Sequence, residues 1–112
     1  LEPLGYRVTS ISVRDCLHLK SAATALGDDR VLLNPRLIDV TVFDGLSWME
    51  IDPAEPNAAN VVSIDAIVLC PASAPRTQER LAQAGFDARA VEASELAKAE
   101  GGLTCCSLLL RI

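Results

Sequence analysis

The sequence predicts an α/β fold in which short strands alternate with helices. Short runs rich in Val, Ile and Leu indicate the strands. Between two of these runs lies a segment, Pro75 to Ala84, whose flanking Ser, Pro and Gly residues mark the start and the end of a helix. The predicted elements also recur in a loose twofold order of strand, hairpin and helix, with no exact internal repeat. Alternation of this kind is typical of the α/β class.

The first part of the chain is predicted to form a strand and then a hairpin. Apolar residues with mostly period-two spacing indicate a strand over 6–13. The pattern of residues 19–26 fits a strand or a helix. Because Gly27-Asp28-Asp29 is a turn signal between two apolar runs, we expect a hairpin over 20–33, with its second strand at 31–33.

A helix is expected to follow the hairpin. Asn34 can cap a helix, and Pro35 suits the first helical position because its ring fixes a helical φ. The apolar residues that follow would share one face, and Asp44-Gly45 would end the helix. The segment also contains several β-branched residues, which lower helix propensity and weigh against this prediction.

The second part of the chain is predicted to continue the alternation. Strands are expected at 48–51, 60–69, 86–91 and 103–112, a loop at 52–57, and helices at 75–84 and 94–98. Ser73 is the expected N-cap of the longer helix, and Gly85 is expected just after its end. The charged residues at 76–80 indicate a helix face in water, and Trp48 indicates packing in the core or at a sheet edge.

Composition bounds the class of protein. A chain of 112 residues fits one domain, and because only 4% of it is aromatic, Leu, Val, Ile and Ala must fill the core. The formal net charge of −5 argues against a nucleic-acid backbone as partner, which needs a basic face. We find no signal-peptide pattern and no apolar run of about eighteen residues, so neither a leader nor a membrane span is expected.

The chain has four cysteines, two of which are adjacent. In a chain with an ordinary globular composition, we interpret them as reduced thiols of a cytoplasmic protein. Cys16, Cys70 and Cys106 are expected to be structural residues. A zinc site is not expected, because Cys105, Cys106 and the one histidine lack the spacing of structural zinc ligands.

Two separated segments carry the residues most suited to chemistry. A Gly pair at 101–102 leads into Leu-Thr-Cys-Cys-Ser at 103–107, and a cysteine just after such a turn can act as a nucleophile. His18, the only histidine, lies in Cys-Leu-His-Leu-Lys-Ser at 16–21 and is its natural partner. From the residues alone, a buried small cysteine and a core histidine remain the plainer interpretations.

These two segments, in this order and at this separation, resemble the dimethylarginine dimethylaminohydrolase family over residues 5–112. Ser-Glu-Leu at 94–96 and Ala-Ala-Asn at 58–60 support the resemblance. It implies the pentein fold, an α/β propeller of five ββαβ-like modules, of which this chain has room for about two. Residues 1–112 would then be the C-terminal portion of a catalytic domain whose N-terminal portion is absent.

The resemblance also implies an activity and the residues that perform it. Nω-methylated arginines would be hydrolysed to citrulline plus methylamine or dimethylamine through a covalent thiouronium on a cysteine. Cys105 would be the nucleophile and His18 the acid and base, while Ala99 (through its backbone) and Glu100 would contact the amino-acid end of the substrate. No metal or organic cofactor is implied. The acidic partner of the histidine and the groups that hold the guanidinium and the carboxylate lie upstream in the family, so the chain is expected to be inactive alone.

Two alternatives stay open. The chain could be an arginine deiminase or amidinotransferase relative, although the lysine after His-Leu favours the hydrolase. It could also be a non-catalytic interaction module or a self-associating fragment. The expected partners are a small-molecule guanidine, and either a second copy or the missing N-terminal half, because two propeller modules leave sheet edges and apolar surface uncovered.

Overall fold

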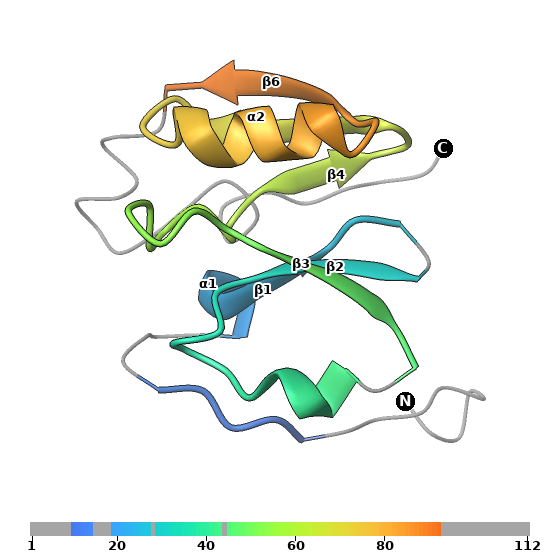
Figure 1. The fold of residues 1–112 in the computed structure, drawn as a ribbon, viewed down its shortest axis with the longest axis vertical. Coiled ribbons are helices and arrows are strands. Elements are labelled where there is room, and N and C mark those ends of the chain that lie inside the picture. The colour runs from blue at the N-terminus through green and yellow to red at the C-terminus, as the bar shows by residue number, and fades with distance from the viewer. Residues whose placement is uncertain (1–9, 15–18, 28, 44, 93–112) are drawn as a thin grey trace, which may run out of the picture.

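The computed structural model describes residues 10–14, 19–27, 29–43 and 45–92. They form two modules with the same order of elements, two antiparallel strands, then a helix, then a third strand parallel to the second (Figure 1). The first module contains β1 (Ala23–Ala25), β2 (Arg30–Leu33), the 3-10 helix η2 (Val40–Phe43) and β3 (Ser47–Glu50), preceded by α1 (Leu19–Ala22). The second contains β4 (Val62–Ile64), β5 (Ile67–Pro71), α2 (Pro75–Gln83) and β6 (Asp87–Val91). The predicted α/β class and the expectation of about two ββαβ modules are confirmed.

The two sheets have the strand orders β1-β2-β3 and β4-β5-β6. The second strand of each module is therefore the central strand, and it pairs with one antiparallel and one parallel neighbour. In the first sheet Leu32 pairs with Thr24 on β1 and with Met49 on β3. A parallel third strand needs a crossover connection, which η2 provides in the first module and α2 in the second.

Two apolar clusters hold the structure together, one on each face of the first sheet. Successive strand residues point to opposite faces, so Leu32 packs on one side while Val31 and Leu33 pack on the other. The cluster around Leu32 joins the two modules, because it includes Val68 of β5 and Leu81 of α2. Burial on both faces explains why β2 reads as a continuous apolar run.

Several predicted elements agree with the structure. The strands expected at 31–33, 48–51 and 86–91 correspond to β2, β3 and β6. The β region expected at 60–69 is a hairpin of β4 and β5, in which Ile64 pairs with Ile67 around a turn at Asp65, whose φ is 54°. Of the strand expected at 6–13, the described part shows one bridge, from Val13 to Ile38. The helix expected at 94–98 and the strand expected at 103–112 lie outside the described residues.

The helix predicted after Asn34 is wrong. Residues 35–37 form a turn, Ile38 pairs with Val13, and only Val40–Phe43 is helical, as a 3-10 turn. Asp39 explains the interruption, because its Oδ1 accepts hydrogen bonds from the Thr41 backbone N–H at 3.0 Å and from Thr41 Oγ1 at 2.8 Å. Local hydrogen bonds of this kind compete with a regular helix. They also lower the pKa of the Asp39 carboxyl.

The start of the hairpin and the cap of α2 also differ from the prediction. The first hairpin begins at Ala23 rather than at residue 20, because Leu19–Ala22 forms a helical turn. The N-cap of α2 is Ala74 and not Ser73. Two backbone N–H groups at the start of α2 donate instead to the side chain of Glu55, which comes from another part of the chain. The expected Gly85 does follow the helix, with a φ of 98° that favours glycine.

Candidate active site

All four residues expected to act on a substrate, His18, Ala99, Glu100 and Cys105, lie outside the described residues. In the chain, His18 directly precedes α1 and the first module, and Cys105 comes after β6, the last strand of the second module. What the structure describes is therefore the two-module scaffold that the two segments flank.

Cys70 is the one cysteine within the described residues, and it is not suited to nucleophilic chemistry. It lies in β5 and is fully buried in the cluster between the modules. Burial disfavours the charged thiolate and raises the pKa of the thiol to about 11. Only a thiolate attacks efficiently, so Cys70 is inert near neutral pH. The expectation of a structural residue is confirmed at this position, while Cys16 and Cys106 lie outside the described residues.

The described residues show neither a metal-binding cluster nor a membrane-spanning helix. They contain no group of three or more His, Cys, Asp or Glu side chains that could hold a metal ion. None of the helices found in the same part of the chain has the length and the apolar character needed to cross a membrane.

The segment between the modules, residues 51–61, includes the loop predicted at 52–57 and contains polar residues that bond to both modules. Glu55 uses both carboxylate oxygens to accept backbone N–H groups at the start of α2. Thr77, fully buried on α2, accepts a hydrogen bond from the backbone of Asp52. Sequence reasoning missed these residues, because the β4–β5 hairpin separates Glu55 from α2 in the chain and no local pattern links the two.

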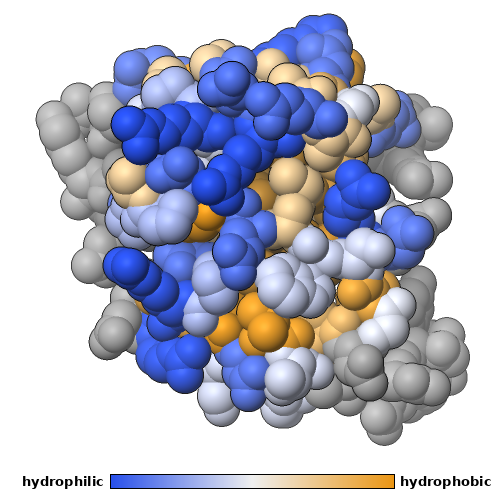
Figure 2. All heavy atoms as spheres, viewed as in Figure 1, coloured by the Kyte–Doolittle hydropathy of each residue, from blue (hydrophilic) through white to orange (hydrophobic). Residues whose placement is uncertain are grey.

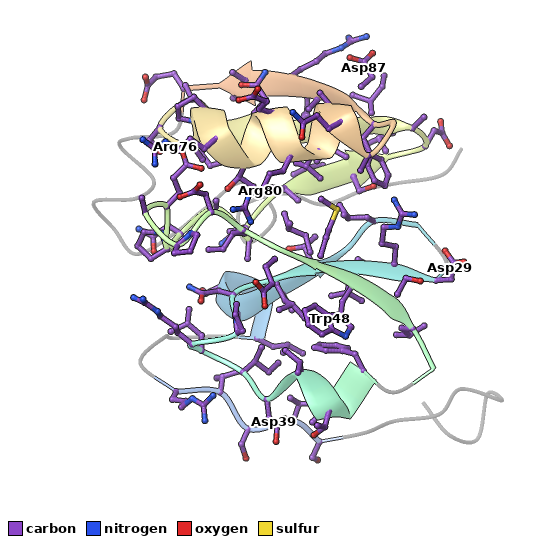
Figure 3. The ribbon with its side chains drawn as sticks, viewed as in Figure 1. Asp29, Asp39, Trp48, Arg76, Arg80 and Asp87 are labelled. Atoms are coloured by element: carbon purple, nitrogen blue, oxygen red, sulfur yellow. The ribbon has the colours of Figure 1, made fainter. Side chains whose placement is uncertain are left out.

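The face of α2 that was expected to lie in water is only partly exposed. Arg76 keeps 68% of its side chain exposed, but Arg80 points from α2 toward residues 51–61 (Figure 3). Its Nη1 donates to the carbonyl oxygens of Glu50 at 3.2 Å and of Ile51 at 3.1 Å, and its Nη2 lies 3.6 Å from Asp52 Oδ2. Arg80 thus ties the helix of the second module to the end of β3 in the first.

A surface groove of mixed polar and apolar lining lies between η2 and β3. It has a volume of about 460 Å³, and its lining residues are Val40, Thr41, Phe43, Gly45, Leu46 and Trp48. Figure 2 shows apolar surface in the lower part of the view, where η2 and β3 lie in Figure 1. Trp48, labelled in Figure 3, is 42% exposed on the end strand of the sheet, which confirms the expected packing at a sheet edge.

Sequence comparisons identify related proteins. No protein-family model matches the chain. A dimethylarginine dimethylaminohydrolase of Streptomyces coelicolor is 41% identical over 98% of the chain, and one of Pseudomonas aeruginosa is 32% identical over 96%. The chain spans 42% of the length of each of these proteins.

Comparison with solved structures agrees with the sequence comparisons. A variant of the Pseudomonas aeruginosa enzyme in complex with citrulline matches with a TM-score of 0.79 and 28% identity, over 93% of the chain and 41% of that protein. A dimethylarginine dimethylaminohydrolase adduct with S-methyl-L-thiocitrulline matches with a TM-score of 0.74 and 30% identity, over 82% and 36%. An amidinotransferase of saxitoxin biosynthesis from Microseira wollei has a TM-score of 0.83 over 95% and 35%, but at 19% identity it shows the fold alone. The resemblance to the dimethylarginine dimethylaminohydrolases and the partial pentein fold are thereby confirmed.

Proposed function

We propose that this chain, a relative of the dimethylarginine dimethylaminohydrolases, is the C-terminal portion of a hydrolase that converts Nω-methylated arginines to citrulline. The observation that carries the proposal is 41% identity to such an enzyme over 98% of the chain, including the part that contains His18 and Cys105. The sequence relatives are hydrolases, whereas the amidinotransferase is similar in fold only, which favours hydrolysis over group transfer.

The proposed reaction begins with the thiolate of Cys105. A cationic guanidinium beside the sulfur favours the thiolate, which attacks the central guanidinium carbon and forms a C–S bond. His18 in its protonated form donates a proton to the methylated nitrogen as the C–N bond breaks, and dimethylamine or methylamine leaves. The product of this half-reaction is a thiouronium covalently attached to Cys105.

Water completes the cycle. His18, now neutral, takes a proton from the water that attacks the thiouronium carbon. The C–S bond then breaks, citrulline is released and Cys105 returns as a thiolate. Neither half-reaction requires a metal or an organic cofactor. Ala99, through its backbone, and Glu100 would contact the amino-acid end of the substrate. The citrulline bound to the Pseudomonas aeruginosa variant supports a ligand of this class.

The first test compares two polypeptides, the product of the complete reading frame and the 112-residue chain alone. We expect the former to release citrulline from dimethylarginine and monomethylarginine, and the latter to release none, because the acidic partner of His18 and the guanidinium-binding groups are proposed to lie upstream. A colorimetric citrulline assay with arginine as a third substrate measures this. Turnover of arginine in preference to its methylated forms would support the deiminase alternative. Release by the 112-residue chain, abolished by Cys105→Ser, would overturn its proposed inactivity.

A second proposal is that the 112-residue chain self-associates through the groove between η2 and β3. Leu46 and Trp48, which line the groove, are 40% and 42% exposed, and Val42 on η2 is 41% exposed. β6 is an edge strand of the other sheet and carries the exposed ion pair Asp87–Arg89 at 2.8 Å. Charged side chains on an edge strand disfavour pairing with a strand of another molecule. β3 has no such pair among its four residues, Ser47–Glu50.

We therefore expect Trp48→Glu to shift the chain toward the monomer. A charge introduced into apolar contact surface must be desolvated without a partner, which weakens association by about tenfold or more. Multi-angle light scattering at several concentrations measures the shift. Ile64→Glu is the matched control, because Ile64 is 43% exposed but lies on the β4–β5 hairpin. A wild-type chain that is monomeric at every concentration would contradict the proposal.

A further inference from the structure

Glu55 closes the start of α2 from a distance of 22 positions in the chain. Its Oε1 accepts the backbone N–H of Thr77 at 2.7 Å, and its Oε2 accepts that of Arg76 at 3.0 Å. The first N–H groups of a helix have no partner within the helix, and a carboxylate there also interacts favourably with the positive end of the helix dipole. Ala74, the N-cap, contributes no side-chain hydrogen bond, so Glu55 substitutes for a local cap.

Asp52 strengthens the same junction. Its backbone N–H donates to Thr77 Oγ1 at 3.0 Å, and its carboxylate lies 3.6 Å from Arg80 and 4.0 Å from Arg76. Thr77 is fully buried, so loss of its hydroxyl would leave a largely buried N–H group without a partner. The junction therefore consists of directed hydrogen bonds as well as apolar packing.

Residues 51–61 also form side-chain hydrogen bonds with the first module. Thr24 Oγ1 on β1 donates to the Ala59 carbonyl oxygen at 2.6 Å. Asn34 Nδ2, just after β2, donates to the Pro56 carbonyl oxygen at 2.9 Å. The segment thus bonds to both modules through side chains and does not merely connect them.

We propose that Glu55 and Thr77 are positioning residues for the reaction proposed above, on which this inference rests. His18 directly precedes the first module in the chain, and Cys105 comes after the second. Because these two groups must meet in the proposed reaction, we infer that the angle between the modules influences how they meet. Glu55 and Thr77 would fix that angle through their hydrogen bonds between residues 51–61 and α2, without acting on the substrate themselves. Proton transfer to a leaving amine is sensitive to displacements of about 1 Å, which can cost about 10²-fold in rate.

The kinetic test uses the complete protein and two substrates that differ in their need for His18. Dimethylamine needs a proton to leave, whereas the methanethiol of S-methyl-L-thiocitrulline leaves as a weakly basic thiolate. In single-turnover experiments we expect Glu55→Ala to slow dimethylamine release about tenfold more than methanethiol release. Glu79→Ala is the matched control, because Glu79 is exposed on the same helix. Equal slowing of both releases would mean only a loss of folded enzyme and would overturn the proposal.

Thr77 provides an independent pair of variants for the same kinetic test, and hydrogen exchange of Glu55→Ala provides a readout that does not require activity. Thr77→Val keeps the shape of the side chain but removes the acceptor for the Asp52 N–H, whereas Thr77→Ser retains it. We expect Thr77→Val, and not Thr77→Ser, to reproduce the substrate-dependent slowing. Hydrogen exchange of the Arg76 and Thr77 amides should accelerate at least about tenfold in Glu55→Ala. Unchanged exchange contradicts the role of Glu55, whereas a wild-type enzyme without turnover contradicts the proposed function itself.

Discussion

Cys105→Ser in the complete protein is expected to abolish citrulline release from dimethylarginine, with kcat reduced by about 10⁴-fold or more. The guanidinium carbon is a poor electrophile because its positive charge is delocalised, so the reaction depends on a strong nucleophile. A thiolate is available near neutral pH beside a cationic substrate, whereas a serine hydroxyl stays protonated. Steady-state citrulline assays of wild type and variant at equal protein concentration measure the loss.

Cys70 supplies the control for this experiment. Because burial raises the pKa of its thiol to about 11, Cys70→Ala should leave kcat within about twofold of wild type. Iodoacetamide at about pH 7.5 should inactivate the enzyme and label Cys105, while Cys70 stays unlabelled. Peptide mass spectrometry identifies the labelled cysteine. Retention of substantial turnover by Cys105→Ser, or inactivation that maps to Cys70, would sink the assignment of the nucleophile.

His18→Gly is expected to divide the reaction into its two halves. Without the acid, departure of the amine from dimethylarginine should become slow, and kcat should fall by about 10²–10⁴-fold. S-methyl-L-thiocitrulline should still react with Cys105, because its thiol leaving group needs no proton. Without the base to activate water, the thiouronium should then accumulate and add to the intact mass of the protein.

Imidazole in solution provides the check on His18→Gly. Because the glycine leaves space where the side chain was, added imidazole should restore part of the turnover and shorten the lifetime of the adduct. An enzyme that keeps near-wild-type kcat without imidazole, or one that never forms the adduct, would show that His18 does not perform this role.

The elements that could be predicted from the sequence are those whose signals are local. β2 and β6 have continuous or alternating apolar patterns, and α2 has Pro75 at its start and Gly85 after its end. The wrong helix after Asn34 depended on the same kind of signal. There the Asp39–Thr41 hydrogen bonds and the pairing of Ile38 with Val13 prevailed, and the second of these is a long-range contact that no local pattern contains.

Some residues of the candidate site could likewise be predicted from local signals, and others could not. His18 and Cys105 were identified from short motifs and their order, and they remain predictions because both lie outside the described residues. Glu55 and Thr77 carry no motif. Their importance is visible only once the fold brings residues 51–61 against the start of α2.

The sequence by itself determined the α/β class, the twofold order of the modules and the relationship to the dimethylarginine dimethylaminohydrolases. Each of these follows from side-chain period, turn residues or a short motif, all of which are local in the chain. Only the tertiary structure decided that Glu55 rather than Ser73 closes α2, and that Arg80 faces residues 51–61. It also supplied the reason why Cys70, already expected to be structural, is an inert thiol, namely its full burial between the modules. The physical reason is that capping, ion pairing and burial depend on which surfaces meet, and these contacts join residues more than twenty positions apart.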